Sequence, residues 1–324
     1  MPTLRRSVVE SGPERAAEDG RKARIALVIL LAGALGIAFS PIFVRLSELG
    51  PTATAFHRIF LALPALWLWQ YMESRGPRRP RQPAGWPDYL GLIAAGVFFA
   101  GDLAFWHWSI RFTSVANATL LANFAPVFVT LYGFVLFGQR FSRTFLIGMS
   151  LALAGACILM GQSLNLGAGH LLGDAFGVVT AMFYAAYIVA VGRLRERFST
   201  ATIMAWSGLV TGAILLPVAL ISGESLIATT LFGWTMLIGL ALISHAGGQS
   251  MIAYALAHLP AAFGSVSLLL QPAAAAVLAW LILGEALGQW QAVGAVVILA
   301  GIYLARRGSQ SIRPVSGSGK PNQT

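Results

Sequence analysis

The chain between Ile25 and Leu304 consists almost entirely of apolar stretches of about twenty residues, separated by short breaks that carry charges, proline or glycine. An α-helix needs about 20 apolar residues to cross the hydrocarbon layer of a bilayer. Only 10% of the residues are charged, whereas soluble domains carry about 25%. The sequence therefore predicts an all-α membrane protein. We expect ten transmembrane helices, at residues 25–46, 52–72, 87–109, 114–136, 144–162, 170–192, 201–222, 230–256, 261–283 and 287–305.

The basic residues indicate how these helices are oriented. With the N-terminus inside the cell, 19 of the 22 lysines and arginines fall in the tails or in inner loops. Arg45 and Arg111 fall outside, and Arg58 lies within a predicted span. Inner loops of membrane proteins are rich in lysine and arginine, so both termini are predicted to be cytoplasmic. We therefore interpret the net charge of +10 as a topology signal, and we expect no nucleic-acid partner. The predicted location is the cytoplasmic (inner) membrane.

The two halves of the sequence resemble each other. With a shift of 146 residues, Pro126 aligns with Pro272, Gly138 with Gly284 and Leu153-Ala154-Gly155 with Leu299-Ala300-Gly301. A five-helix unit that is repeated must enter the membrane from opposite sides, which gives an inverted repeat. We expect repeats at 25–162 and 170–305, between disordered cytoplasmic tails at 1–24 and 306–324. The alternative is that the shared composition of membrane helices alone produces the match.

Glycines in the matched segments have two predicted roles. Gly138 and Gly284 suit a left-handed stop between two antiparallel helices. Gly148 and Gly155, and likewise Gly294 and Gly301, lie seven residues apart. Residues at this spacing share one helix face, so these glycines would allow two helix backbones to approach closely.

The motifs resemble one known group of proteins. They are the stretch from Asp102 through Asn117 to Pro126, the segment from Ser267 through Gln271-Pro272 to Glu285, and Arg58 in Ala-Phe-His-Arg-Ile. This pattern is similar to that of the EamA-type ten-helix members of the drug/metabolite transporter superfamily. The resemblance implies a 5+5 inverted repeat around a central cavity. It also implies alternating-access transport of small metabolites, in many cases amino-acid export.

Asp102 is the strongest candidate for a functional residue. An ionisable group at membrane depth is costly unless it is paired or faces water. Arg58 is expected at a comparable depth, so one interpretation is a structural ion pair between the two. The other is that Asp102 binds substrate or a proton. Trp106 follows Asp102 by four residues on the same helix face, and an indole beside a carboxylate suits an ammonium group.

Further polar side chains are predicted at membrane depth on other spans. Buried hydroxyl and amide groups need hydrogen-bond partners, so each of these residues either contacts substrate or joins two helices. With Asp102 and Trp106, the candidate substrate-binding residues are Asn117, Asn123, Tyr184, Tyr187, His245, Gln249 and Gln271.

These features favour a secondary transporter that exports a small metabolite, an amino acid or a related amphipathic compound. The alternatives are a membrane-embedded enzyme and a membrane scaffold that transports nothing. An enzyme would need a convergent catalytic set, and the sequence has neither HExxH nor GxSxG. With Cys157 as the single cysteine, we expect no metal and no cofactor. The substrate, the direction of transport, coupling to protons and the choice between monomer and homodimer stay open.

Overall fold

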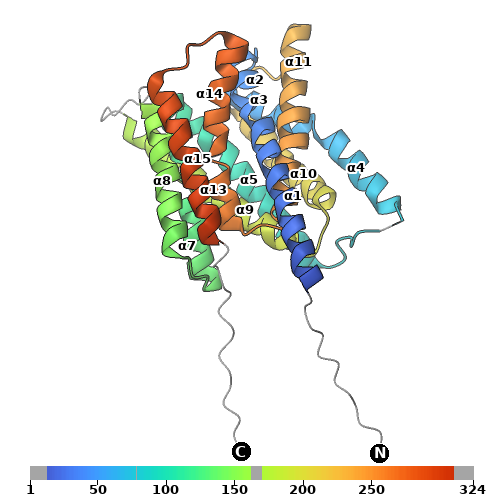
Figure 1. Cartoon of the computed structure of the whole chain (residues 1–324). Coiled ribbons are helices and arrows are strands. Elements are labelled where there is room, and N and C mark those ends of the chain that lie inside the picture. Colours follow the sequence, from blue (N-terminus) through green and yellow to red (C-terminus); the bar gives the residue numbers. More distant parts are fainter. Residues whose placement is uncertain (1–12, 78, 162–169, 310–324) are drawn as a thin grey trace, which may run out of the picture.

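The computed structural model describes residues 13–77, 79–161 and 170–309, and over these ranges its regular secondary structure is entirely helical (Figure 1). This confirms the predicted all-α class. Residues 1–12 and 310–324 of the predicted tails, and the segment 162–169, lie outside the described residues.

The first half of the chain forms α1 (Pro13–Ala38), α2 (Ser40–Leu46), α3 (Pro51–Phe60), α4 (Leu63–Arg75), α5 (Trp86–Phe112), α6 (Val115–Ala122), α7 (Ala125–Phe137) and α8 (Arg143–Met160). The second half forms α9 (Leu171–Leu194), α10 (Thr200–Ile221), α11 (Leu231–Gly239), the π-helix η3 (Leu240–Gln249), α12 (Ser250–Ala255), α13 (Ala261–Ser267), α14 (Leu270–Leu283) and α15 (Gln289–Ser309).

Within the described ranges, nine helical stretches are long and apolar enough to cross a membrane. The remaining predicted span, 52–72, which is the second in the chain, is instead divided into α3 and α4 by a turn at Leu61 and Ala62. Pro64 has no backbone N–H, so it cannot donate the helical hydrogen bond to the carbonyl of Phe60. The helix is interrupted at this point for that reason.

Corresponding helices of the two halves are broken at corresponding places. Residues 123–124 separate α6 from α7, and residues 268–269 separate α13 from α14. In each case a proline follows within a few residues, Pro126 or Pro272, and removes one helical hydrogen bond. The second helix of each pair then ends at a glycine in the left-handed conformation, Gly138 (φ 61°) or Gly284 (φ 70°). The predicted left-handed stops are thus confirmed.

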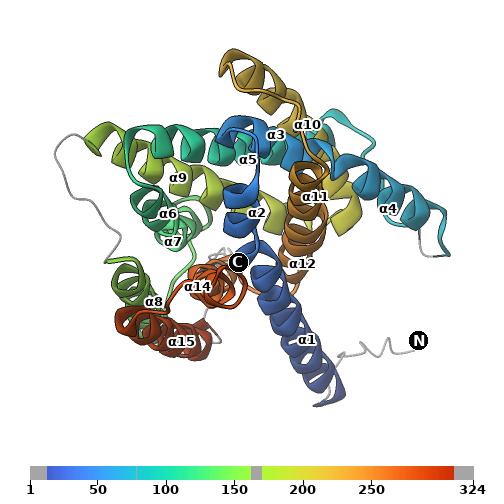
Figure 2. The ribbon, with the colours of Figure 1, turned by 90° about the horizontal axis from the view of Figure 1, so that it is seen from above.

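Helices α8 and α15 pack backbone against backbone (Figure 2). A Cβ atom on Gly301 would lie 2.4 Å from the backbone nitrogen of Ala152, and one on Gly155 would lie 2.6 Å from that of Ile298. Because these distances are shorter than any normal Cβ contact, only the hydrogen atom of glycine fits at these two positions. The close approach predicted from the glycine spacing is confirmed, and it joins the last helix of each half.

Helix α1 begins earlier than the sequence analysis predicted. Residues 13–24 were expected within a disordered tail, but they form the first turns of α1. Lys22 and Glu18 are one helical turn apart and form an ion pair at 2.8 Å. Such pairs support an exposed helix by a few tenths of a kcal/mol.

The ends of the helices define two faces of the bundle. We call the face where α1 begins and α15 ends the terminal face, and the face where α2 ends and α11 begins the opposite face (Figure 1). The long helices α5 and α9 lie side by side. The breaks in the helices and the α5–α9 pair surround the space that forms the candidate site.

Candidate functional site

A cavity of about 440 Å³ lies in the part of the bundle nearer the opposite face. Both halves of the chain line it: α1, α2, α3, α5, α6 and α8 from the first, and α9, η3 and α14 from the second. The volume is within the range of small-molecule sites, about 300–1,000 Å³. Its walls are mostly apolar, and its polar lining residues are Ser40, Thr54, Arg58, Asp102, Trp106, His107, Thr119, Asn123, Thr180, Tyr184, Gln249 and Gln271.

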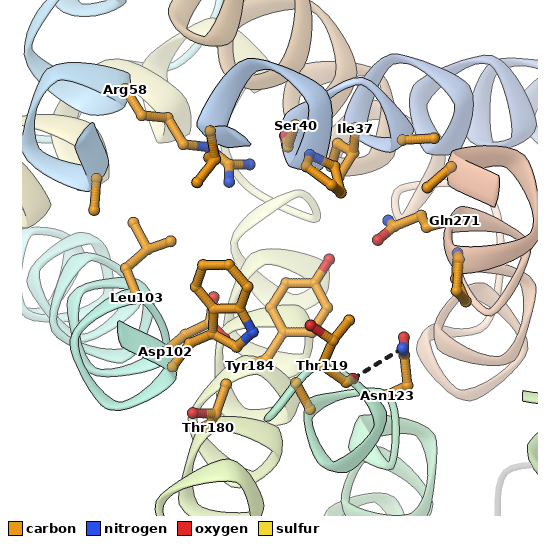
Figure 3. Close-up of a pocket in the computed structure, with 18 of the residues that line it drawn as sticks. Ile37, Ser40, Arg58, Asp102, Leu103, Thr119, Asn123, Thr180, Tyr184 and Gln271 are labelled. Atoms are coloured by element: carbon orange, nitrogen blue, oxygen red, sulfur yellow. Dashed lines mark hydrogen bonds between the residues drawn. The ribbon is translucent and has the colours of Figure 1, made fainter. Parts of the chain in front are cut away.

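Asp102 on α5 and Arg58 on α3 both line the cavity. Among the ion pairs formed by the described residues, none joins these two side chains, so every N–O distance between them exceeds 4.0 Å. The predicted direct ion pair is therefore not formed. The physical reason is that the two groups extend from different walls of a cavity that separates them (Figure 3).

Aromatic side chains form part of the wall beside Asp102. Trp106 lines the cavity one turn along α5, as its spacing from Asp102 predicts. Tyr184 on α9 extends its ring into the same space, close to Thr180 on that helix (Figure 3). An anion with aromatic rings beside it favours a cationic group through charge attraction and cation–π contact.

Amide side chains approach from the other elements. Gln271 on α14 points into the cavity from the side facing Asp102 and Tyr184 (Figure 3). The Nε2 atoms of Gln271 and Gln249 are both buried without a hydrogen-bond partner in the described part of the chain. Asn123 donates to the carbonyl oxygen of Thr119 at 2.9 Å. The two glutamines therefore offer donors that a bound molecule can use.

Tyr187 and His245 were predicted to bind substrate, but the structure places them behind the lining of the cavity. The ring of Phe99, which does line it, stacks on Tyr187 with 4.6 Å between centroids and on His245 with 5.5 Å. Tyr187 and His245 are each 1% exposed. They lie one layer behind the residues that line the cavity, so they support its wall.

Asn117 also lies away from the cavity. It occupies the first turns of α6, where its Nδ2 donates to the Asp174 carboxylate at 3.2 Å. Asp174 lies in the first turn of α9. Asn117 thus joins two helix ends near the opposite face, which is the helix-joining role left open by the sequence analysis.

Several lining residues did not enter the predicted set. Ser40 follows the interruption of the first predicted span, Thr54 lies within α3, and Thr119 precedes Asn123 by one helical turn. His107 follows Trp106 directly. The Ser40-Pro41 dipeptide could have indicated Ser40, because a proline at membrane depth interrupts the helix, and interrupted helices line the binding sites of transporters.

A second, smaller cavity of about 200 Å³ lies near the terminal face between α7, α9 and the α12–α13 connection. Arg193, Glu196 and Gln139 give it a polar lining. Along α9, Tyr184 lines the first cavity and Val189 the second, while Tyr187 and Ile188 between them are buried. The two cavities share no lining residue. The described residues bring together no group of three or more His, Cys, Asp or Glu side chains able to hold a metal ion.

Comparison with known proteins agrees with this architecture. The model of the EamA-like transporter family matches twice, at residues 24–161 and 171–307. An uncharacterized transporter of Archaeoglobus fulgidus is 28% identical over 82% of this chain and 92% of its own length. The pseudopaline exporter CntI of Pseudomonas aeruginosa is 25% identical, over 86% of this chain and 95% of its own length. A probable amino-acid metabolite efflux pump of Salmonella typhimurium is 28% identical, over 86% and 93%.

One solved crystal structure of a protein superposes with a TM-score of 0.75, at 19% identity, over 89% of this chain and 98% of the other. The likeness shows a shared fold. The two family matches also account for the correspondence between the halves, including the broken helices that end at Gly138 and Gly284. The chain is a multi-pass membrane protein that belongs to the EamA-like transporter family.

Proposed function

We propose that the protein is a secondary transporter that exports an amino acid or a related amphipathic metabolite. The observation that carries this proposal is the central cavity, which both repeats line and which combines apolar walls with unpartnered polar groups. Inverted-repeat transporters bind substrate at the interface between their repeats. Relatives named as exporters of pseudopaline, of a terminal-alkyne amino acid and of amino-acid metabolites support the substrate class.

The proposed mechanism is alternating access. The larger cavity lies towards the opposite face and the smaller one towards the terminal face, and α9 lines both, with Tyr184 in the first and Val189 in the second. Rocking of one repeat against the other would close the first cavity and connect the site with the second.

The proposed topology has ten spans in the cytoplasmic membrane, with α3 and α4 together forming the second. The repeats are 25–162 and 170–305, in a 5+5 inverted arrangement, and both termini are cytoplasmic. The distribution of lysine and arginine supports this orientation. In that orientation the larger cavity faces the outside, which is the side where an exporter releases its substrate.

The test is uptake of a labelled amino-acid panel into proteoliposomes, with and without a pH gradient. Trp106→Ala and Tyr184→Ala should each reduce transport at least about tenfold, because they remove contacts within the binding site. The matched controls are Trp290→Ala and Tyr303→Ala, at residues of α15 that are 58% and 57% exposed. They should retain transport. Unchanged kinetics in both cavity variants would contradict the proposed site.

A further inference from the structure

We propose that Arg58 and Asp102 together recognise the two charges of one zwitterionic molecule, Arg58 its carboxylate and Asp102 its ammonium group. The inference rests on the proposed function and names the charge pattern of its substrate. It follows from the placement of two opposite charges on different walls of one cavity.

The first step concerns the charges themselves. Asp102 bears the only carboxylate, and Arg58 the only guanidinium, among the described residues that line the cavity. They form no ion pair with each other. The Nε atom of Arg58 is buried and has no hydrogen-bond partner in the part of the chain that the structure describes. Charges at membrane depth are retained where they meet a partner, water or a ligand.

The second step concerns what can satisfy both groups. A guanidinium presents a planar fork of donors that matches a carboxylate with two parallel hydrogen bonds. An ammonium group on the same ligand would pair with Asp102 and face the ring of Trp106 or Tyr184, both of which line the same space. The carboxamide of Gln271 approaches from α14, and its Nε2 atom, which has no partner among the described residues, can donate a hydrogen bond to the same carboxylate.

The third step concerns selectivity. A ligand with a single charge satisfies one of the two protein groups and leaves the other desolvated without a partner, which penalises its binding. The remaining walls are apolar, with Ile37, Leu103 and Met160 among the lining residues. The site therefore favours a free amino acid with an apolar side chain over the corresponding amine, amide or carboxylic acid.

The experiment compares three compounds that share one phenyl skeleton: L-phenylalanine, L-phenylalaninamide and 3-phenylpropanoate. Binding to the purified full-length protein is measured by tryptophan fluorescence and thermal shift, and transport by counterflow in proteoliposomes. We expect L-phenylalanine to bind at least about tenfold more tightly than either singly charged analogue. Equal binding of an analogue would overturn the inference while leaving the proposed transport function intact.

Variants provide a readout that altered folding does not mimic. Arg58→Gln should shift the preference towards L-phenylalaninamide, and Asp102→Asn should shift it towards 3-phenylpropanoate, because each variant keeps one of the two charges. The double variant Arg58→Gln/Asp102→Asn leaves the cavity without an uncompensated charge. It can therefore be measured even if a single buried charge prevents one of the single variants from folding. Arg111→Gln, at an exposed position near the end of α5, is the matched control and should keep the wild-type order.

An unchanged order of preference in both single variants would overturn the assignment. Absence of binding by all twenty free amino acids, with transport of another metabolite, would do the same.

Discussion

Arg197, between α9 and α10, pairs with the carboxylate of Asp88 at the start of α5, with 2.9 Å between Nη2 and Oδ1. Asp88 lies in the first repeat and Arg197 in the second. Arg81 approaches the other carboxylate oxygen at 2.9 Å, and Ser199 donates to Glu73 nearby at 2.5 Å. These contacts tie the repeats together at the terminal face, on the far side of the bundle from the larger cavity.

The first prediction concerns this cluster. Arg197→Gln alone should lower the free energy of unfolding by about 0.5–1 kcal/mol, because Arg81 still pairs with Asp88. The double variant Arg81→Gln/Arg197→Gln should lose more than the sum of the single losses, up to about 3 kcal/mol, since it leaves a buried carboxylate without a cation. Thermal or denaturant unfolding in detergent measures both effects. Arg79→Gln, at an exposed residue of the same loop, is the control, and additive losses would contradict the shared pairing.

The second prediction concerns the contact between α8 and α15. Alanine is a better helix former than glycine by about 1 kcal/mol, so Gly301→Ala should stabilise an isolated helix. Here it should destabilise the protein, by about 1–3 kcal/mol, because the new Cβ atom would lie 2.4 Å from the backbone of Ala152. The control is Gly161→Ala, where a Cβ atom meets nothing within 4 Å. A melting temperature of Gly301→Ala at or above that of the wild type would refute the backbone contact.

The third prediction is a pH dependence at the opposite face. The Glu48 carboxylate accepts hydrogen bonds from the hydroxyl of Thr230 and, at 2.8 Å, from the backbone N–H of Thr229. These donors lower the pKa of Glu48 from 4.5 to about 2. The ionised carboxylate therefore stabilises the folded state above about pH 4.5, and this contribution is lost as the pH falls towards 2.

The matched comparison for Glu48 uses two glutamine variants. At pH 7, Glu48→Gln should have a lower melting temperature than the wild type, and the gap should narrow at pH 3. Glu196→Gln, at an exposed position in the lining of the smaller cavity, serves as the control at both pH values. A gap of equal size at pH 7 and pH 3 would show that ionised Glu48 does not hold the start of α11.

The fourth prediction concerns orientation in the membrane. Single cysteines are introduced at Ser225 and at Arg79 in a Cys157→Ala background. A membrane-impermeant maleimide should label Ser225→Cys in intact cells and Arg79→Cys only after permeabilisation, because the basic loops are expected inside. Labelling of both from the same side would refute the proposed topology.

Much of the candidate site was predictable from residue type at membrane depth. Asp102, Trp106, Tyr184 and Gln271 all line the cavity, because a polar group in an apolar helix must face the interior of the bundle. Depth alone did not distinguish Tyr184 from Tyr187, three residues apart on one helix. The structure turns the first into the cavity and stacks the second on Phe99, a difference of rotation about α9 that depends on its packing against α5.

The sequence by itself determined the helical class, the membrane environment, the repeat and the glycine faces that allow helix backbones to approach closely. These properties depend on hydrophobicity, on segment length and on the absence of side chains, whereas the pairing of α8 with α15 came from the tertiary structure. The tertiary structure decided whether Arg58 and Asp102 pair directly, where Asn117 finds its partner, and how α3 and α4 divide the second predicted span. Those outcomes depend on how separate helices pack against each other. The distance between Arg58 and Asp102 across the cavity, for example, is fixed only once α3 and α5 have taken their places in the bundle.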